Sequence, residues 1–151
     1  MAGRDRLVGA VVAAMGLAGV AVSIYLTFVH YSAAPLVCST SGAIDCERVL
    51  TSGFAVIGGS ALPTSAAGIV WFTVSAGLAI AQLAGRGSPL LSRAQLAWSA
   101  LGLATVLGLV FIEIVMLGAV CLWCTVAHAL VLITFLVVIT TRRPGVEGGR
   151  A

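Results

Sequence analysis

The stretch CLWCTVAHALVLITFLVVITT, residues 121–141, decides the fold of this chain. It contains no Asp, Glu, Lys or Arg. At about 20 residues it is long enough for a helix to cross the ~30 Å hydrocarbon core of a bilayer. A charge-free apolar run of this length is typical of a membrane-spanning helix. The two cysteines at its head, Cys121 and Cys124, add a chemical motif to the span.

Three further apolar stretches precede it, at about 7–29, 64–84 and 94–117. The whole chain is 60% hydrophobic and 9% charged, with a mean hydropathy of +1.15. A soluble domain carries about 25% charged residues, and a disordered chain combines low hydrophobicity with high charge, so the composition argues against both classes. We therefore expect an all-α membrane protein. It would be a four-transmembrane-helix bundle in a single domain over residues 1–151, with residues 30–63 as an outer loop and short-helix cap.

The arginines indicate how the bundle is oriented. Seven of the eight fall on one side of a chain that crosses four times: Arg4, Arg6, Arg86, Arg93, Arg142, Arg143 and Arg150. Only Arg48 falls on the other side. By the positive-inside rule, we expect both termini in the cytoplasm and all four cysteines on the outer side of the plasma membrane. The net charge of +3 is not clustered on one face, so we expect contact with lipid and none with nucleic acid.

A cleaved signal peptide is the alternative interpretation of the first apolar stretch. Arg4 and Arg6 provide a basic start, and the small residues at positions 32–34 resemble a cleavage site. However, the apolar run of about 23 residues exceeds the about 7–15 residues of a signal-peptide core. We therefore favour a span that stays in the protein.

The Cys-x-x-Cys motif of Cys121 and Cys124 is expected at the start of a helix, on the outer side where disulfides persist. This setting lowers the pKa of a thiol, because the helix dipole stabilises the thiolate. The thiolate is the species that attacks a disulfide. His128 follows at a spacing that places it on the same helix face, about one turn deeper.

The second cysteine pair, Cys38 and Cys46, has a wider spacing. The seven residues between them suit a surface loop that forms and breaks a disulfide. Asp45 is a candidate N-cap for a short helix from Cys46 to about Ser52. Two cysteine pairs on one membrane face favour a thiol–disulfide relay. Two static disulfides that staple the loop are the alternative, whereas a zinc site normally shows two close-spaced pairs, so we expect no metal.

Other residues in the spans leave alternatives open. A histidine inside a span is costly, so His128 either binds a ligand carbonyl, such as that of a membrane-soluble quinone, or bonds a backbone carbonyl. Glu113 either relays protons or is an interfacial carboxylate that reaches toward water. Three tryptophans are expected as interface anchors or packing residues: Trp71, Trp98 and Trp123.

The order of these features resembles the vitamin K epoxide reductase family in its short bacterial form. A wide cysteine pair leads into CERVLTS at 46–52, and IVWF at 69–72 follows Gly68, which has a polar residue four positions before it. The Cys-x-x-Cys motif then heads the last span. The resemblance covers nearly the whole chain.

The resemblance implies an enzyme in which four helices surround a quinone of the menaquinone or ubiquinone type. Cys38 would receive electrons from a thioredoxin-fold partner, Cys46 would pass them to Cys121, and Cys124 would reduce the quinone. The residues implied to bind the quinone are Ser52, Thr64 and His128. Some members of the family carry a fused thioredoxin-like domain; this chain ends about ten residues after the last span, so we expect a separate extracytoplasmic partner.

Two positions depart from the family pattern. Thr64 stands where the family often has Asn, and His128 stands where the animal enzymes have Tyr. Both can form hydrogen bonds, but through different atoms. The departures count against vitamin K epoxide as a substrate and leave a quinone-coupled relay intact.

We therefore expect a quinone-dependent thiol–disulfide oxidoreductase that drives disulfide formation in secreted proteins. One alternative is a vitamin K epoxide or quinone reductase that regenerates a quinol. Another is a non-enzymatic membrane protein with structural disulfides. The unrelated disulfide bond formation protein B also has four spans and two cysteine pairs, but its pairs come in the reverse order.

Overall fold

The computed structural model describes residues 2–32, 38, 42–86 and 88–141. Two sequence-based predictions fall partly outside these ranges. The orientation used Arg142, Arg143 and Arg150, and the alternative cleavage site included residues 33 and 34. The elements in chain order are α1 (Ala2–Ser32), α2 (Cys46–Leu50), α3 (Thr64–Ala81), η1 (Gln82–Arg86), α4 (Pro89–Phe111), η2 (Ile112–Leu117) and α5 (Leu122–Thr141).

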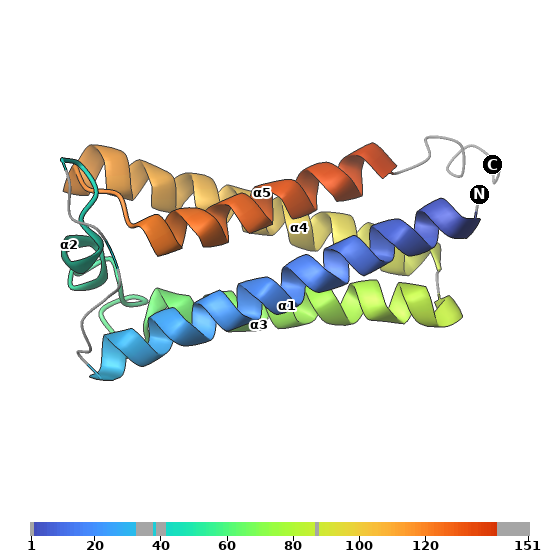
Figure 1. Cartoon of the computed structure of the whole chain (residues 1–151), viewed down its shortest axis with the longest axis horizontal. Helices are drawn as coiled ribbons and strands as arrows, with labels where there is room; N and C mark the ends of the chain where they lie inside the picture. Colours follow the sequence, from blue (N-terminus) through green and yellow to red (C-terminus); the bar gives the residue numbers. More distant parts are fainter. Residues whose placement is uncertain (1, 33–37, 39–41, 87, 142–151) are drawn as a thin grey trace.

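Four long helices run side by side as a bundle, and the short helix α2 lies across one end of it (Figure 1). The start of α1 and the end of α5 both lie at the opposite end. Four segments are long and apolar enough to cross a membrane: Arg6–Ser32, Thr64–Gly85, Pro89–Leu117 and Leu122–Thr141. The described residues contain no strand, so the prediction of an all-α four-helix membrane bundle is confirmed.

Small residues let α1 approach α3, its most extensive partner in the bundle. A Cβ added at Gly16 would lie 2.8 Å from the Cβ of Ala76. A Cβ added at Gly19 would clash with the ring of Phe72. Close approach of this kind is how helices associate in lipid, where no hydrophobic force drives them together.

α1 is longer at both ends than the expected span of about 7–29, and two further helix ends differ from the sequence-based expectation. α4 begins at Pro89 rather than near residue 94, because the Ser88 hydroxyl caps the helix by accepting the Leu91 N–H and Pro89 occupies the first turn. Arg93 therefore lies within the helix and not in the connection before it. The short outer helix ends at Leu50, two residues earlier than expected.

Residues 43–45 and the turn before α5 are joined by backbone hydrogen bonds. The Asp45 N–H donates to the Val120 carbonyl (3.1 Å), and the Val120 N–H donates to the Ala43 carbonyl (2.8 Å). Asp45 also caps α2, because its carboxylate accepts the Arg48 N–H at 3.0 Å, as the sequence predicts. This pairing places the first residue of α2, Cys46, beside the residue that precedes α5, Cys121.

Candidate functional site

The structure gathers all four cysteines at the capped end of the bundle. Cys46 and Cys121 are buried, and they form one cluster together with Val49 and Ala119. Cys38 and Cys124 pack against the same cluster. Two cysteine pairs that are more than 70 residues apart in the sequence are therefore one group of sulfur atoms in space.

The two pairs are in different redox states. Cys38 and Cys46 form a disulfide, whereas Cys121 and Cys124 are free thiols. The Cys121 sulfur accepts the backbone N–H of Cys124 at 3.2 Å. A hydrogen bond from the Cys124 thiol lowers the pKa of Cys121, and the backbone N–H groups at the start of α5 lower it further. Cys121 therefore gives up its proton more readily than an ordinary thiol, as expected near a helix N-terminus.

A cavity of about 650 Å³ lies beside the sulfur cluster. Its wall comes from all four long helices, from α2 and η2, and from the connection between α2 and α3, and most of it is apolar. The volume lies within the about 300–1,000 Å³ of small-molecule sites. Of the four cysteines only Cys124 lines the cavity. Cys121 does not, although helical spacing predicts that the two share a face. Its sulfur turns back over the first turn of α5 and accepts the Cys124 N–H there.

The three residues implied to bind a quinone all line this cavity together with Cys124. The Ser52 hydroxyl donates to the Val49 carbonyl (2.7 Å), and the Thr64 hydroxyl donates to the Phe54 carbonyl (3.2 Å). Each hydroxyl has a single hydrogen, so it donates to a ligand carbonyl only by rotating away from its backbone carbonyl. His128 lies one turn after Cys124 on α5, half-buried in the cavity wall.

Two tryptophans form a wall of the cavity that sequence reasoning missed. The Trp71 indole N–H donates to the Trp98 carbonyl (3.1 Å), and the Trp98 indole N–H donates to the Trp71 carbonyl (3.0 Å). Both residues line the cavity, so they are packing residues that also shape the site. Gly102 makes room for this arrangement, because a Cβ there would clash with the Trp71 ring. Nothing in the sequence shows that Trp71 and Trp98 face each other.

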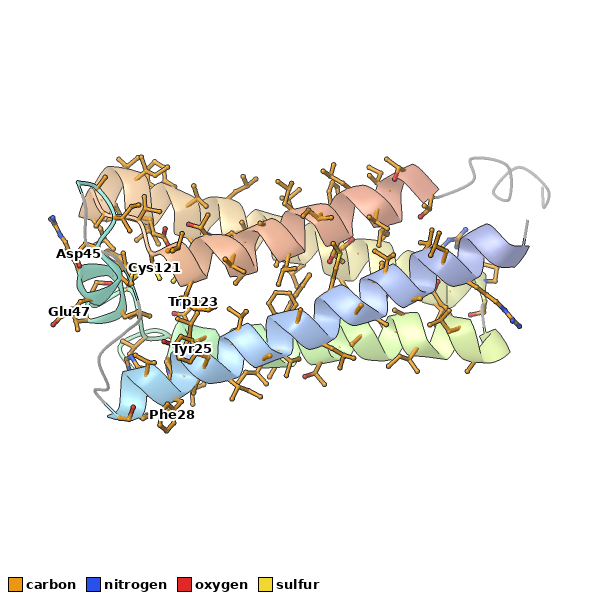
Figure 2. The ribbon with its side chains drawn as sticks, viewed as in Figure 1. Tyr25, Phe28, Asp45, Glu47, Cys121 and Trp123 are labelled. Atoms are coloured by element: carbon orange, nitrogen blue, oxygen red, sulfur yellow. A yellow bond between two sulfur atoms is a disulfide. The ribbon has the colours of Figure 1, made fainter. Side chains whose placement is uncertain are left out.

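The third tryptophan, Trp123, joins the Cys-x-x-Cys motif to α1. Its ring lies against the ring of Tyr25, with 5.0 Å between centroids and 57° between planes. Figure 2 shows the two side chains pointing toward each other between α5 and α1, close to Cys121. The contact fixes the start of α5, and with it the position of both thiols.

Exposed residues of the cavity wall form an apolar rim. Val70 of α3 is 59% exposed and Leu101 of α4 is 56% exposed, and Phe54 and Leu62 of the connection are also exposed. In a bilayer this rim meets acyl chains rather than water. The chemistry of the cavity fits a lipid-soluble quinone: an apolar volume, a few hydroxyl and imidazole groups, and one thiol.

Among the described residues, Glu113 is the one carboxyl group in the cavity wall. Its side chain is only 6% exposed, so the expectation of an interfacial carboxylate that reaches toward water is wrong. The reason is the turn after it: η2 and the left-handed Gly118 fold the chain back, and the Ala119 N–H donates to the Glu113 carbonyl at 3.1 Å. The start of α5 therefore covers Glu113.

A model of the vitamin K epoxide reductase family matches residues 10–139. The chain belongs to this family. The match covers most of the chain and confirms the resemblance drawn from its cysteines. Membership in the vitamin K epoxide reductase family identifies a membrane oxidoreductase of the thiol–disulfide and quinone type. The family is linked to quinones and generally works with thioredoxin-like partners. A comparison with curated proteins gives no match.

Proposed function

We propose that this protein transfers electrons from a separate thioredoxin-fold protein to a quinone and thereby drives disulfide formation in secreted proteins. One observation carries the proposal: the four sulfur atoms form a single cluster that reaches the wall of an apolar cavity. A protein stapled by static disulfides has no need for a free thiol pair in this position.

The first transfer takes place at the cap. A thiolate of the partner attacks Cys38 in the Cys38–Cys46 disulfide, and Cys46 leaves as a thiolate. A second partner thiol then releases the partner as a disulfide, so that two electrons remain on Cys38 and Cys46. Cys38 suits this contact, because it is only half-buried whereas Cys46 is fully buried.

The second transfer takes place inside the cluster. Cys46 attacks Cys121 in the oxidised Cys121–Cys124 pair, and Cys124 leaves as a thiolate. Cys38 then attacks Cys46 and restores the first disulfide. The structure corresponds to the state after this step, with Cys38–Cys46 oxidised and Cys121 and Cys124 reduced.

The last transfer takes place at the cavity, where the quinone substrate accepts two electrons and two protons. Cys124 is the thiol that touches this substrate, since it alone among the cysteines lines the wall. Three neighbouring groups orient the quinone by donating hydrogen bonds to its carbonyl oxygens: the hydroxyls of Ser52 and Thr64 and the imidazole of His128. The quinone is of the menaquinone or ubiquinone type, and its tail lies against the apolar rim.

The proposed orientation places the α2 end of the bundle outside the cell and both termini in the cytoplasm. Arg6 lies near the start of α1 and Arg86 ends η1, both at the end away from α2. The positive-inside rule assigns that end to the cytoplasm. The sulfur cluster then faces the oxidising side of the plasma membrane, where its partner is found.

The test uses purified protein in nanodiscs, a reduced thioredoxin-fold oxidase and a soluble quinone, with quinone absorbance as the readout. We expect turnover in the wild type, loss of turnover in Cys38→Ala that a small dithiol restores, and loss in Cys124→Ser that the dithiol does not restore. The dithiol bypasses the cap but not the thiol at the cavity.

Two results would count against the proposal. Cysteines that resist mild reductant, together with no turnover of any quinone, would leave a membrane protein with structural disulfides. Reduction of an added vitamin K epoxide in place of the quinone would favour a quinol-regenerating enzyme.

A further inference from the structure

Quinone reduction by the Cys121–Cys124 pair raises a problem of proton transfer. Two S–H bonds break, one bond forms between the two sulfurs, and two electrons and two protons pass to the quinone, which becomes a quinol. Cys124 lines the cavity, so its proton has a short route to the substrate. Cys121 is fully buried and does not line the cavity, so its proton needs a carrier.

Glu113 lies beside Cys121, at the turn that precedes α5. Its carboxyl group accepts the backbone N–H of Cys121 and interacts electrostatically with the thiols of Cys121 and Cys124. The same residue belongs to the cavity wall. It is buried, and α2 packs over η2 on its outer side, so water has little access to this region.

A π-helical turn holds Glu113 in this position. η2 spans Ile112–Leu117, directly after the regular helix α4 and before the left-handed Gly118. A left-handed glycine directly after the last turn is a common helix ending, and here it turns the chain back so that Cys121 comes beside Glu113. A buried carboxyl group in a spanning segment is also costly, which makes it a candidate for function.

We propose that Glu113 carries the proton of Cys121 to the quinone. The carboxylate takes the proton from the Cys121 sulfur as the disulfide with Cys124 forms, and passes it to a quinone oxygen in the cavity. The carboxylate is then restored, so Glu113 is unchanged over one turnover. This inference rests on the proposed function, since it assigns a role within the same quinone reduction.

Glu113→Gln is the informative substitution, because glutamine keeps the shape and still accepts the Cys121 N–H through its amide oxygen. It cannot carry a proton. A purely structural role for Glu113 would therefore survive this change, whereas a proton-carrying role would not. Glu113→Asp is the rescue variant, because it keeps the carboxyl group, one methylene shorter.

The experiment measures the two half-reactions separately in nanodiscs. In the first, reduced partner is mixed with oxidised protein, and thiol labelling of Cys124 is followed. In the second, reduced protein is mixed with a soluble quinone, and quinone absorbance is followed. We expect Glu113→Gln to slow the second about a hundredfold, within the range for loss of a general acid or base, and to leave the first within about twofold. Glu113→Asp recovers most of the loss.

Glu47→Gln is the matched control, since Glu47 is an exposed carboxylate on α2 outside the cavity and undergoes the same change. It leaves the quinone half-reaction unchanged. If Glu113→Gln slows both half-reactions equally, or leaves both at the normal rate, the proton-carrying role is overturned. Wild-type turnover in the same experiment would still uphold the proposed function. A wild-type protein that reduces no quinone would overturn the proposed function, and this role with it.

Discussion

The two ends of the bundle are built in different ways. At the inner end, Val12, Ala13, Ala79 and Val138 form a small cluster of aliphatic side chains. At the outer end, the cluster consists largely of sulfur, and a cavity of about 650 Å³ with hydroxyl, imidazole and carboxyl groups lies beside it. The contrast separates two tasks: the inner end holds the helices together, and the outer end leaves space for chemistry.

The outer end also combines a long helix with a very short one. Cys124 is in the first turn of the 20-residue helix α5, and Trp123 holds that turn against Tyr25 of α1. Cys46 heads a helix of only five residues, which is joined to the turn before α5 by backbone bonds to Val120 and to Cys38 by the disulfide. A relay needs this difference, because one sulfur must exchange partners while the other stays beside the substrate.

The largest effect is expected from trapping the exchange between the two pairs. In Cys38→Ser/Cys124→Ser, only Cys46 and Cys121 remain, and their shared cluster predicts nearly complete formation of a disulfide between them. Non-reducing peptide mapping by mass spectrometry measures it. The control, Cys38→Ser/Cys121→Ser, leaves Cys46 with Cys124, which faces the cavity, and we expect far less cross-link. Equal yields of the two cross-links would mean that the position of Cys46 does not favour Cys121 over Cys124.

At the inner end, a change in packing is expected to affect stability and not chemistry. Gly16→Val forces α1 away from Ala76, whose Cβ lies only 2.8 Å from an added Cβ. Overpacking of this kind costs about 1–3 kcal/mol of the free energy of unfolding. A denaturant titration in mixed micelles measures the loss, and quinone turnover by the folded fraction stays normal. Gly77→Val is the control, since nothing lies within 4 Å of an added Cβ there.

Between the two ends, the tryptophan pair is expected to control the shape of the cavity. Gly102→Ala pushes the Trp71 ring away from α4 and breaks the reciprocal bonds with Trp98. The displaced ring changes the shape of the wall, and we expect a loss of about 1.4 kcal/mol in quinone binding, which is a rise of about tenfold in KM. Gly108→Ala is the control on the same helix, because its added Cβ meets nothing within 4 Å. Similar KM values in the two variants would show that the tryptophan pair does not affect quinone binding.

The sequence predicts the spans well, because a run of about 20 apolar residues has few alternatives to a transmembrane helix. It predicts the start of α4 poorly, because hydropathy alone overlooks the cap at Ser88 and Pro89. The Asp45 cap is a local feature and is predicted correctly. Local signals of this kind determine where helices begin. Ser88 and Pro89 are both in the sequence, so capping signals, unlike hydropathy, place the start of α4 correctly.

Features that depend on how the helices meet could not be predicted. The burial of Glu113 requires the turn at Gly118, and the tryptophan pair requires the register between α3 and α4. The separation of Cys121 from the cavity arises because its sulfur turns back to accept the Cys124 N–H, which a helical wheel does not show. Tertiary contacts determine all three features, and such contacts cannot be derived from a single sequence.

The smallest effect is expected where one hydroxyl group at the outer end is removed. Thr64→Val keeps the shape of the side chain but takes away the group proposed to bind the quinone carbonyl. Loss of one hydrogen bond of about 0.5–1.5 kcal/mol predicts a KM for the quinone about two- to twelvefold higher, with kcat nearly unchanged. Steady-state kinetics with a soluble quinone measures both.

Thr105→Val tests whether the position of the hydroxyl matters. Thr105 lines the same cavity from α4, and its hydroxyl donates to the Leu101 carbonyl at 3.0 Å. It lies two turns before Glu113 along the helix, farther from the thiols, where an apolar tail rather than a carbonyl is expected. Its removal therefore leaves KM unchanged. An equal rise in both variants would mean that the cavity wall as a whole, and not Thr64, determines the affinity for the quinone. Polar contacts would then not distinguish the outer end of the cavity from the rest of the bundle.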